Sequence, residues 1–397
     1  MELYVCRYVQ PSVHYTSDAP YYVPDLVIDR FSSLVWCERY YEPGDFVLML
    51  RATPELMRYF ADNELLILRK DTDRGMIPEY IELTSSPDAG DVLKITGRSA
   101  ESLLNRRTIL QTLTWNENML SGTAANAVLF FAEKNISDFY YYHNDSTGVF
   151  TDKYRYMPFL TQHNLALEEL MADFPEKITA QPFGKNLGEF TAETAKACGF
   201  GYRIKVDKST MKMELEVYRG SDRTLNQSER EPVIFAPGFN GLATSTYSID
   251  RRAYYNVGYA AGEGDGKDRK IGTGLISTGT LQPPFYWMCM GATRRERFID
   301  AKSVSSNSAG VDGDPLKYSL LLTDTALKGI EPYQQKTSFS GQALPNGPSR
   351  YRTDYFLGDR VSARNPYISG TATVTEVTET IGESGHQAIP TLAEWRE

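Results

Sequence analysis

The first hundred residues alternate between apolar and polar positions in short runs separated by turn-forming residues. Alternation with a period of two is the pattern of a strand with one buried face. The expected strands are 25–28, 34–41, 46–50, 65–69, 77–84 and 92–96. Two short helices are expected at 54–61 and 100–107, the second behind Ser99, whose hydroxyl can accept from a first-turn amide. This part of the chain is therefore strand-rich.

The tetrapeptide Glu42-Pro43-Gly44-Asp45 is the clearest turn signal among these strands. Proline fixes φ at the first central position of a turn, and glycine accepts positive φ at the second. We therefore expect a type II turn with positive φ at Gly44. Such a turn would reverse the chain at the surface and join its two flanking strands as a hairpin.

The section 113–230 mixes helical and strand periodicity. Apolar side chains at the spacing of one helix face predict a helix over 187–198, which Gly199 would end in the left-handed conformation. Two alternating segments, 202–206 and 213–218, then predict a β-hairpin. Together with a helix expected at 123–134, this section predicts an α+β domain.

Strand pattern returns after residue 231. The expected strands are 233–235, 254–260, 297–300, 359–363 and 371–380. Gly358 and Asp359 are turn candidates at the start of the fourth of these strands. A helix is expected at 319–328, within a helical and loop segment near 301–350 that is inserted in this last section. The fold class is therefore α+β and β-rich, with domains at 1–112, 113–230 and 231–397.

The charge balance limits the classes of partner. The 397 residues carry a net charge of -9 and include 26 tyrosines, while no run approaches the length of a membrane span. An acidic chain lacks the global positive field that nucleic-acid binders use, so we expect DNA to pass without specific binding. We also expect assembly in the cytosol and no stable membrane insertion.

A search for catalytic chemistry finds no motif of the expected spacing. The four histidines and four cysteines form no metal-ligand pattern, and there is no Gly-x-Ser-x-Gly elbow. The glycine-rich segment 262–269 lacks the Gly-Lys-Ser/Thr ending of a phosphate loop and is expected to connect two strands tightly. Arg294, Arg295 and Arg297 are expected to be salt-bridged at the start of a strand. We therefore expect no catalytic residue, no cofactor and no metal.

Several short motifs follow one another along the chain in a specific order. They include Arg39-Tyr40-Tyr41-Glu42-Pro43-Gly44-Asp45-Phe46, Ala261-Gly262-Glu263-Gly264, Leu357-Gly358-Asp359-Arg360-Val361 and Thr375-Glu376-Val377-Thr378-Glu379, with shorter matches at 31–36, 79–82, 96–98, 121–123, 217–220, 233–235, 255–257 and 294–296. In this order the sequence resembles the siphophage tail-hub family. These tail-associated proteins are encoded after the tape measure and distal tail proteins and are similar to the baseplate hub of contractile phages.

The resemblance implies a structural protein of the virion tail tip. It implies a homotrimer in which each chain contributes two β-barrel-like tube domains, at 1–112 and 231–397, braced by the α+β middle domain. Three copies would then match the sixfold symmetry of the tail tube. The implied partners are the distal tail protein, the tape measure protein and a tail fibre or receptor-binding protein. Many relatives carry a C-terminal hydrolase or fibre extension, and we expect that enzyme to be absent from this chain.

Two other functions stay open at this stage. A tail-associated cell-wall hydrolase would need a carboxylate pair in a cleft, for which Glu79 with Glu82 and Glu168 with Glu169 are the candidates, although a solvated face is the commoner origin of such pairs. A receptor- or carbohydrate-binding module would need the tyrosines gathered on an exposed face. The proline- and tyrosine-rich insertion 10–24 reads as a lumen plug, an interchain arm or a plain loop.

Overall fold

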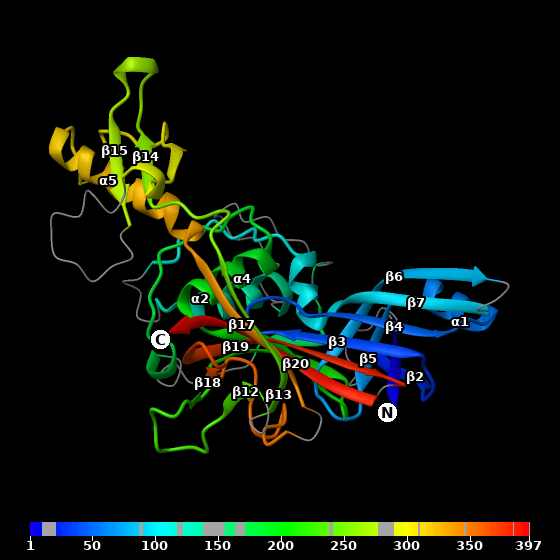
Figure 1. Ribbon diagram of the computed structural model, residues 1–397. Coiled ribbons are helices and arrows are strands. Elements are labelled where there is room, and N and C mark those ends of the chain that lie inside the picture. The colour runs from blue at the N-terminus through cyan, green and yellow to red at the C-terminus, as the bar shows by residue number, and fades with distance from the viewer. Residues whose placement is uncertain are drawn as a thin grey trace. The chain divides into compact units, whose positions relative to one another are not determined.

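The computed structural model describes most of the chain as two compact units. The described residues are 1–9, 21–86, 90–116, 122–137, 155, 157–162, 171–237, 241–276, 290–308, 310–344, 347–383 and 385–396. Residues 1–246 and 339–397 form the first unit, and residues 247–338 form the second (Figure 1). The three-domain division at 112 and 230 stays a prediction.

Seven strands from the first hundred residues make one half of a large sheet in the first unit. They are β1 (Leu3–Tyr8), β2 (Tyr22–Ile28), β3 (Ser33–Arg39), β4 (Asp45–Arg51), β5 (Leu65–Arg69), β6 (Gly75–Ser86) and β7 (Gly90–Ser99). Their spatial order is β3-β4-β7-β6-β5-β1-β2, so β2 is an edge strand. The helix α1 (Pro54–Asp62) begins at Thr53, whose hydroxyl accepts from the Leu56 amide. Each expected strand and the first helix are confirmed.

The C-terminal strands close on themselves into a six-stranded barrel. The strands are β12 (Ile234–Pro237), β13 (Gly241–Asp250), β17 (Lys336–Ala343), β18 (Arg360–Arg364), β19 (Ser369–Gly382) and β20 (Gly385–Arg396). Their order is β18-β12-β13-β17-β20-β19, and pairing of β18 with β19 closes the ring. The short β11 (Asp222–Arg223) pairs with β18 from outside this ring. Closure leaves the barrel without an open edge.

The barrel and the seven-stranded half are one continuous sheet. β19 pairs antiparallel with β3, with Thr378 opposite Cys37. This contact joins residues more than three hundred positions apart in the sequence. The fold is therefore strand-rich α+β, as the sequence predicts, and it contains a closed six-stranded barrel of the kind that the family resemblance implies.

A small α+β layer completes the first unit. It contains α2 (Ala124–Ala132), α4 (Leu187–Cys198) and a sheet of β8 (Leu160–Gln162), β10 (Lys212–Tyr218) and β9 (Gly201–Asp207). Gly199 ends α4 with φ of 69°, as predicted. The segment 100–106 is a 3-10 helix, and Ser99 does not cap it. The Ser99 hydroxyl accepts from the Gly44 amide instead, so the expected N-cap is wrong.

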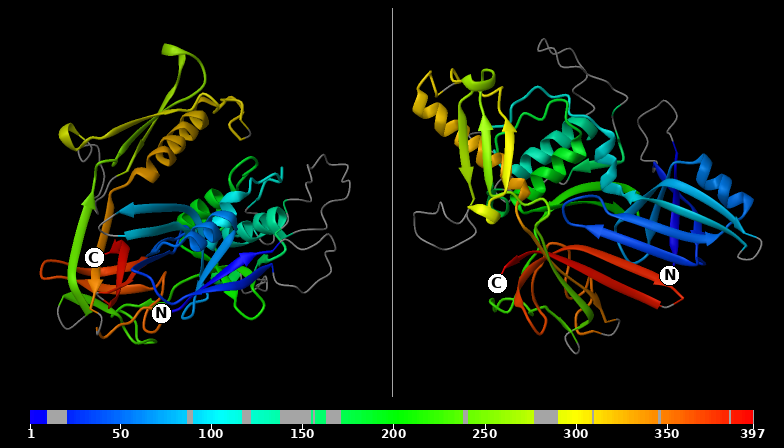
Figure 2. Two further views of the ribbon diagram at one scale, coloured as in Figure 1. Left: turned by 90° about the vertical axis from the view of Figure 1, so that its right-hand side faces the viewer. Right: turned by 45° about the horizontal axis from the view of Figure 1, so that its top comes forward.

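The second unit is a three-stranded sheet with one long helix. Its strands lie in the order β15 (Ile271–Leu275), β14 (Val257–Ala261), β16 (Glu296–Asp300), and α5 (Pro315–Ile330) lies along one face (Figure 2). Glycines let the helix approach closely: a Cβ on Gly272 would lie 2.4 Å from the Leu322 carbonyl carbon. Tyr318, Leu322 and Ala326 of α5 form the core with Ala260 of β14.

Candidate functional site

The described residues contain no cluster of metal ligands and no activated cysteine. Among them, no group of three or more histidine, cysteine or carboxylate side chains could hold a metal ion. Burial raises the pKa of the Cys6 and Cys37 thiols to about 12, so neither is an activated nucleophile. Cys198 is half-buried, and its pKa is also raised by burial. Cys289 lies outside the described residues.

The carboxylate pairs and the glycine-rich segment have structural partners. Glu79 accepts two hydrogen bonds from Arg98, at 2.7 and 2.8 Å, and Glu82 lies 3.4 Å from Lys94. Glu168 and Glu169 lie outside the described residues. The segment 262–269 connects the antiparallel strands β14 and β15, as predicted. Its carboxylates form contacts within the protein. For example, Asp265 accepts a hydrogen bond from Lys302 at 2.7 Å.

Arg39 of β3 organises the predicted turn at 42–45. Its guanidinium contacts Asp45 at 2.6 Å, the Pro43 carbonyl oxygen at 3.1 Å and Glu376 of β19 at 2.6 Å. Glu42 lies at the edge of this group, 4.0 Å from the same side chain. One arginine therefore fastens the β3–β4 connection to the neighbouring strand of the barrel.

The reason for the glycine at position 44 differs from the prediction. Gly44 is buried and lacks a positive φ, so the expected surface type II turn is wrong. A Cβ at this position would lie 2.0 Å from the Cys37 carbonyl oxygen. The connection does join β3 and β4 as an antiparallel pair. Glycine is therefore required by close backbone approach and not by its access to the left-handed region.

Tyr40, just before this connection, is the centre of a second tight contact. Its buried ring lies where the Cβ of Gly201 or Gly358 would be, at 2.2 and 2.4 Å from ring carbons. Its hydroxyl donates to the Tyr218 carbonyl oxygen at 3.3 Å. Gly358 has φ of 88°, which a residue with a side chain rarely adopts. The turn candidate Gly358 therefore packs against Tyr40, which comes two residues before the turn candidates at 42–45.

Asp359 fixes the other side of this contact. Its carboxylate is buried and accepts from the Ser221 amide at 2.7 Å, the Arg223 side chain at 2.8 Å and the Phe356 amide at 3.0 Å. One side chain thus connects β11 with the turn before β18. Asp359 is a structural anchor of the barrel.

A buried ion network crosses the β3–β19 junction. Arg352 donates to Glu38 of β3 at 2.7 Å and lies 2.8 Å from Glu379 of β19. Glu379 also accepts from Arg69 of β5 at 2.8 Å and contacts His386 of β20 at 2.8 Å. These residues join both halves of the large sheet through charge pairs that are mostly excluded from water.

The pKa values of the two glutamates reflect this environment. Burial by itself would raise the pKa of Glu38, but Arg352 and Arg74 outweigh it and lower the pKa to about 2. Burial also opposes ionisation of Glu379, whose pKa is nevertheless lowered by His386, Arg352 and Arg69. Both side chains are therefore ionised at neutral pH, and the network serves as a structural junction.

The sequence pattern did not identify the residues of this junction. Arg39 and Tyr40 belong to the motif 39–46, which places them near the turn but assigns them no partner. Glu38, Arg352 and Glu379 meet only because β3 and β19 pair. Their sequence separation leaves no local signal that could have revealed the network.

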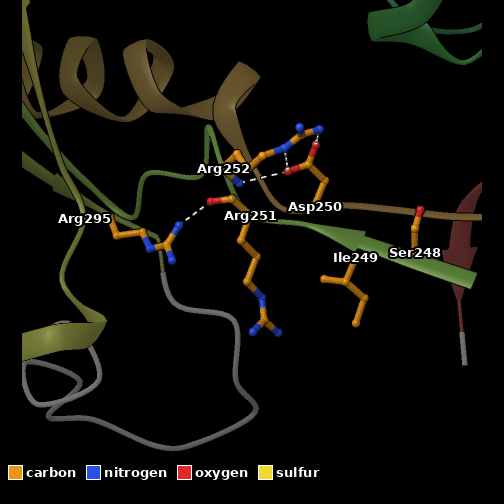
Figure 3. Close-up of a pocket in the computed structure, with 6 residues that line it drawn as sticks. All are labelled: Ser248, Ile249, Asp250, Arg251, Arg252 and Arg295. Atoms are coloured by element: carbon orange, nitrogen blue, oxygen red, sulfur yellow. Dashed lines mark hydrogen bonds and ion pairs between the residues drawn. The ribbon is translucent and has the colours of Figure 1, made fainter.

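The second unit carries a surface rich in arginine and tyrosine. A shallow groove of about 530 Å³ is lined by Ser248, Ile249, Asp250, Arg251, Arg252 and Arg295, which Figure 3 shows as sticks. Arg252 turns back onto Asp250, whereas Ile249 and Arg251 point to the same side. Arg251 donates to Gln335 at 2.7 Å.

The predicted salt bridging of the arginine cluster holds only in part. Arg294 pairs with Glu296, but Arg297 lies over the rings of Tyr255 and Tyr333, at 5.6 and 3.8 Å from their centroids. Among the described residues, Arg295 and Arg297 have no carboxylate partner. Residues 247–338 contain 12 lysines and arginines against 10 aspartates and glutamates, so this unit is basic although the whole chain has a net charge of -9.

In the part of the chain that the structure describes, no helix has the length and apolar content to cross a membrane. No match is found among curated proteins. Two solved structures share the fold. The tail protein from Neisseria meningitidis MC58 is 12% identical, with 99% of this chain and 96% of that chain covered and a TM-score of 0.50. The prophage MuSo2 43 kDa tail protein from Shewanella oneidensis is 9% identical, with 99% and 98% covered and a TM-score of 0.52.

At such low identity these likenesses bear on the fold alone, and the family is given by the sequence. A family model of the Siphovirus ReqiPepy6 Gp37-like protein matches residues 25–392, which is nearly the whole chain. The match covers both strand-rich parts and the α+β layer between them. The chain therefore belongs to the Siphovirus ReqiPepy6 Gp37-like family.

Proposed function

We propose that three copies of this chain form a hub that closes or extends the distal end of the tail tube. The observation that carries the proposal is the continuous sheet, in which a closed barrel and a second, seven-stranded half are joined through β3 and β19. Each chain thus supplies two strand-rich modules. Three chains supply six, the number that a sixfold tube presents to the part below it.

The edge of the sheet supports assembly through strands. Among the described residues, β2 pairs with β1 alone, so its other edge is free. Val23 and Val27 on this strand are exposed. An unpaired edge with apolar side chains is a template for a strand from another chain. In the proposed ring, β2 contacts the neighbouring copy.

The charge of the chain fits a channel that releases DNA. Each lysine or arginine that neutralises a phosphate strengthens binding by counterion release, so a basic bore would retain the genome. The net charge of -9 per chain has the opposite sign. We propose a bore that is not lined by basic side chains, which a surface-potential map of the assembled ring would test.

The proposed place of the hub is the virion tail, between parts of different symmetry. Its partners above are the distal tail protein and the tape measure protein. A tail fibre or receptor-binding protein is the proposed partner below. In this role the chain acts as a scaffold without enzymatic activity.

Light scattering coupled to size exclusion tests the proposal directly. The expected mass is three times the 44.8 kDa of one chain. Val27→Lys on the free edge should weaken the assembly. Leu113→Lys, at an exposed position outside the strands, should leave it intact. A stable monomer at the high local concentration of a tail would reject the hub.

A further inference from the structure

The groove of the second unit carries arginine side chains that neutral groups hold in place. Its lining residues lie at the end of β13, directly after that strand and just before β16 (Figure 3). Arg251 donates through Nε to the side-chain oxygen of Gln335 at 2.7 Å, and Arg295 donates to the Arg251 carbonyl oxygen. The Arg295 guanidinium also lies 5.7 Å from the centre of the Tyr254 ring. None of these contacts removes charge, so both arginines are positioned and stay cationic.

The charges that line the groove do not balance. Asp250 is its one carboxylate, and Arg252 pairs with it at 2.7 Å, so these two charges cancel. Arg251 and Arg295 remain and give the groove a net positive charge. A guanidinium has five N–H donors, and each of these two uses one of them among the described residues. Positioned cationic donors around a hollow favour the binding of an anion.

The lining favours a flexible polyanion over a folded protein as the partner. Ile249 is the one apolar side chain of the groove and is 46% exposed, beside four charged residues and Ser248. The centre of a protein interface is usually built from several apolar or aromatic side chains that become fully buried. A single isoleucine does not supply such a centre. The groove instead offers hydrogen-bond donors and positive charge along a shallow surface.

We propose that this groove binds the phosphate groups of a linear phosphate polymer. The planar guanidinium presents paired N–H donors that match the oxygens of a phosphate. Arg251 and Arg295 come from different segments, so they can reach a tetrahedral oxyanion from two directions. The rings of Tyr254 and Tyr333 each lie beneath a guanidinium, so that side of each ring is closed to a stacking base. The recognised group is therefore the phosphate and not a base.

The inference goes beyond the proposed hub and does not depend on the trimer. A phosphate-binding surface that lined the bore would retain the genome, because each neutralised phosphate strengthens binding by counterion release. In the proposed hub the groove therefore belongs outside the bore. There it can bind a phosphate polymer without hindering the release of DNA.

Fluorescence anisotropy of the full chain with labelled inorganic polyphosphate tests the ligand class. Binding is expected, and its affinity should fall steeply as the sodium chloride concentration rises. Polyglutamate with the same number of charges should bind more weakly, because a carboxylate offers its acceptors in one plane. Oligothymidylate with the same number of phosphates should bind no more tightly than polyphosphate. Equal binding of polyglutamate would indicate general attraction to anions, and tighter binding of oligothymidylate would indicate base recognition. Either result, or no binding of polyphosphate, would overturn the inference.

Two charge substitutions locate the site. Arg251→Gln and Arg295→Gln should each weaken polyphosphate binding about tenfold, the effect of losing one charge-assisted contact, and lower the salt slope by about one. Both positions are exposed, so the melting temperature should not change.

The matched control is Lys317→Gln, which removes one positive charge at an exposed position of the same unit. Lys317 lies near the start of α5 and Gln335 follows its end, so the helix places roughly 20 Å between the control and the groove. At 0.1 M salt, charges further apart than about 10 Å are largely screened, so the control should bind as the wild type does. Wild-type affinity in both arginine variants, or an equal loss in the control, would overturn the inference. A monomer that binds polyphosphate would reject the hub and leave the groove standing.

Discussion

Replacing Arg352 by methionine should destabilise the first unit strongly. Methionine keeps the length and apolar stem of arginine but removes the guanidinium that contacts Glu38 at 2.7 Å and Glu379 at 2.8 Å. Both carboxylates are almost fully buried. The variant leaves two buried charges with fewer partners, which typically costs about 3–5 kcal/mol.

Arg352 is one of several groups that lower the pKa of Glu38, so this pKa gives an upper scale for the pH-dependent part of the cost. Folding lowers that pKa from 4.5 to about 2, against the opposing effect of burial. A difference of this size corresponds to about 3 kcal/mol of stability. A lowered pKa contributes stability that is present above the unfolded value of 4.5 and is lost as the pH falls towards 2. The difference in free energy of unfolding between wild type and variant should therefore be largest near neutral pH. It should decrease as the pH falls from 4.5 towards 2.

Urea unfolding followed by tryptophan fluorescence measures the effect, since Trp36 donates to Glu38 and reports on the network directly. The control is Arg252→Met, which removes a surface ion pair and should change the free energy of unfolding by less than about 1 kcal/mol. Adding Glu38→Gln to the Arg352 variant removes one orphaned charge and should restore part of the loss. A loss below about 1 kcal/mol at neutral pH, or one that does not vary with pH, would refute the reasoning.

Three further predictions concern the glycine contacts and the proposed scaffold role. Gly358→Ala should cost about 2–4 kcal/mol in urea unfolding, because it combines positive φ with a clash against Tyr40, whereas Gly184→Ala, with positive φ but open space, should cost about 1 kcal/mol. Gly44→Ala should cost about 1–3 kcal/mol through its clash with Cys37, and an unchanged melting temperature would contradict the assigned contact. The purified chain should release no muropeptides from peptidoglycan in a chromatographic assay, and release above a boiled control would contradict a purely structural role.

Local features of the fold could be predicted from the sequence. The helix at 187–198 and its end at Gly199 depend on residues within one or two turns of each other. The strands around 46–50 and 65–69 show clear apolar patterns and are found where expected. The sequence does not predict strands β13, β17 and β20. β13 and β17 are rich in serine, threonine and glycine, and β20 is interrupted by Pro390, so all three show little apolar periodicity.

The closure of the barrel and the β3–β19 junction could not be predicted from local sequence patterns. The β18–β19 and β3–β19 pairings are set by the packing of the whole unit, and no local residue pattern specifies them. The turn at 42–45 shows a related limit. Its position was readable from proline and glycine, but the function of Gly44 depends on the Cys37 carbonyl across the hairpin. A glycine that the sequence suggests for a positive φ can instead be required by a close backbone contact, and that contact exists only in the folded chain.

The buried network also specifies how the two halves of the sheet align. Glu379 lies opposite Trp36, and Val377 lies opposite Glu38, so both carboxylates project from the same face towards Arg352. A slip of one residue along β19 would turn Glu379 to the other face and away from its arginines. The slipped pairing would leave buried charges unpaired, which costs free energy. In a junction made only of apolar residues, the same slip would cost much less. Arg352→Met therefore destabilises the native β3–β19 register. It also reduces the free-energy difference between that register and the registers slipped by one residue.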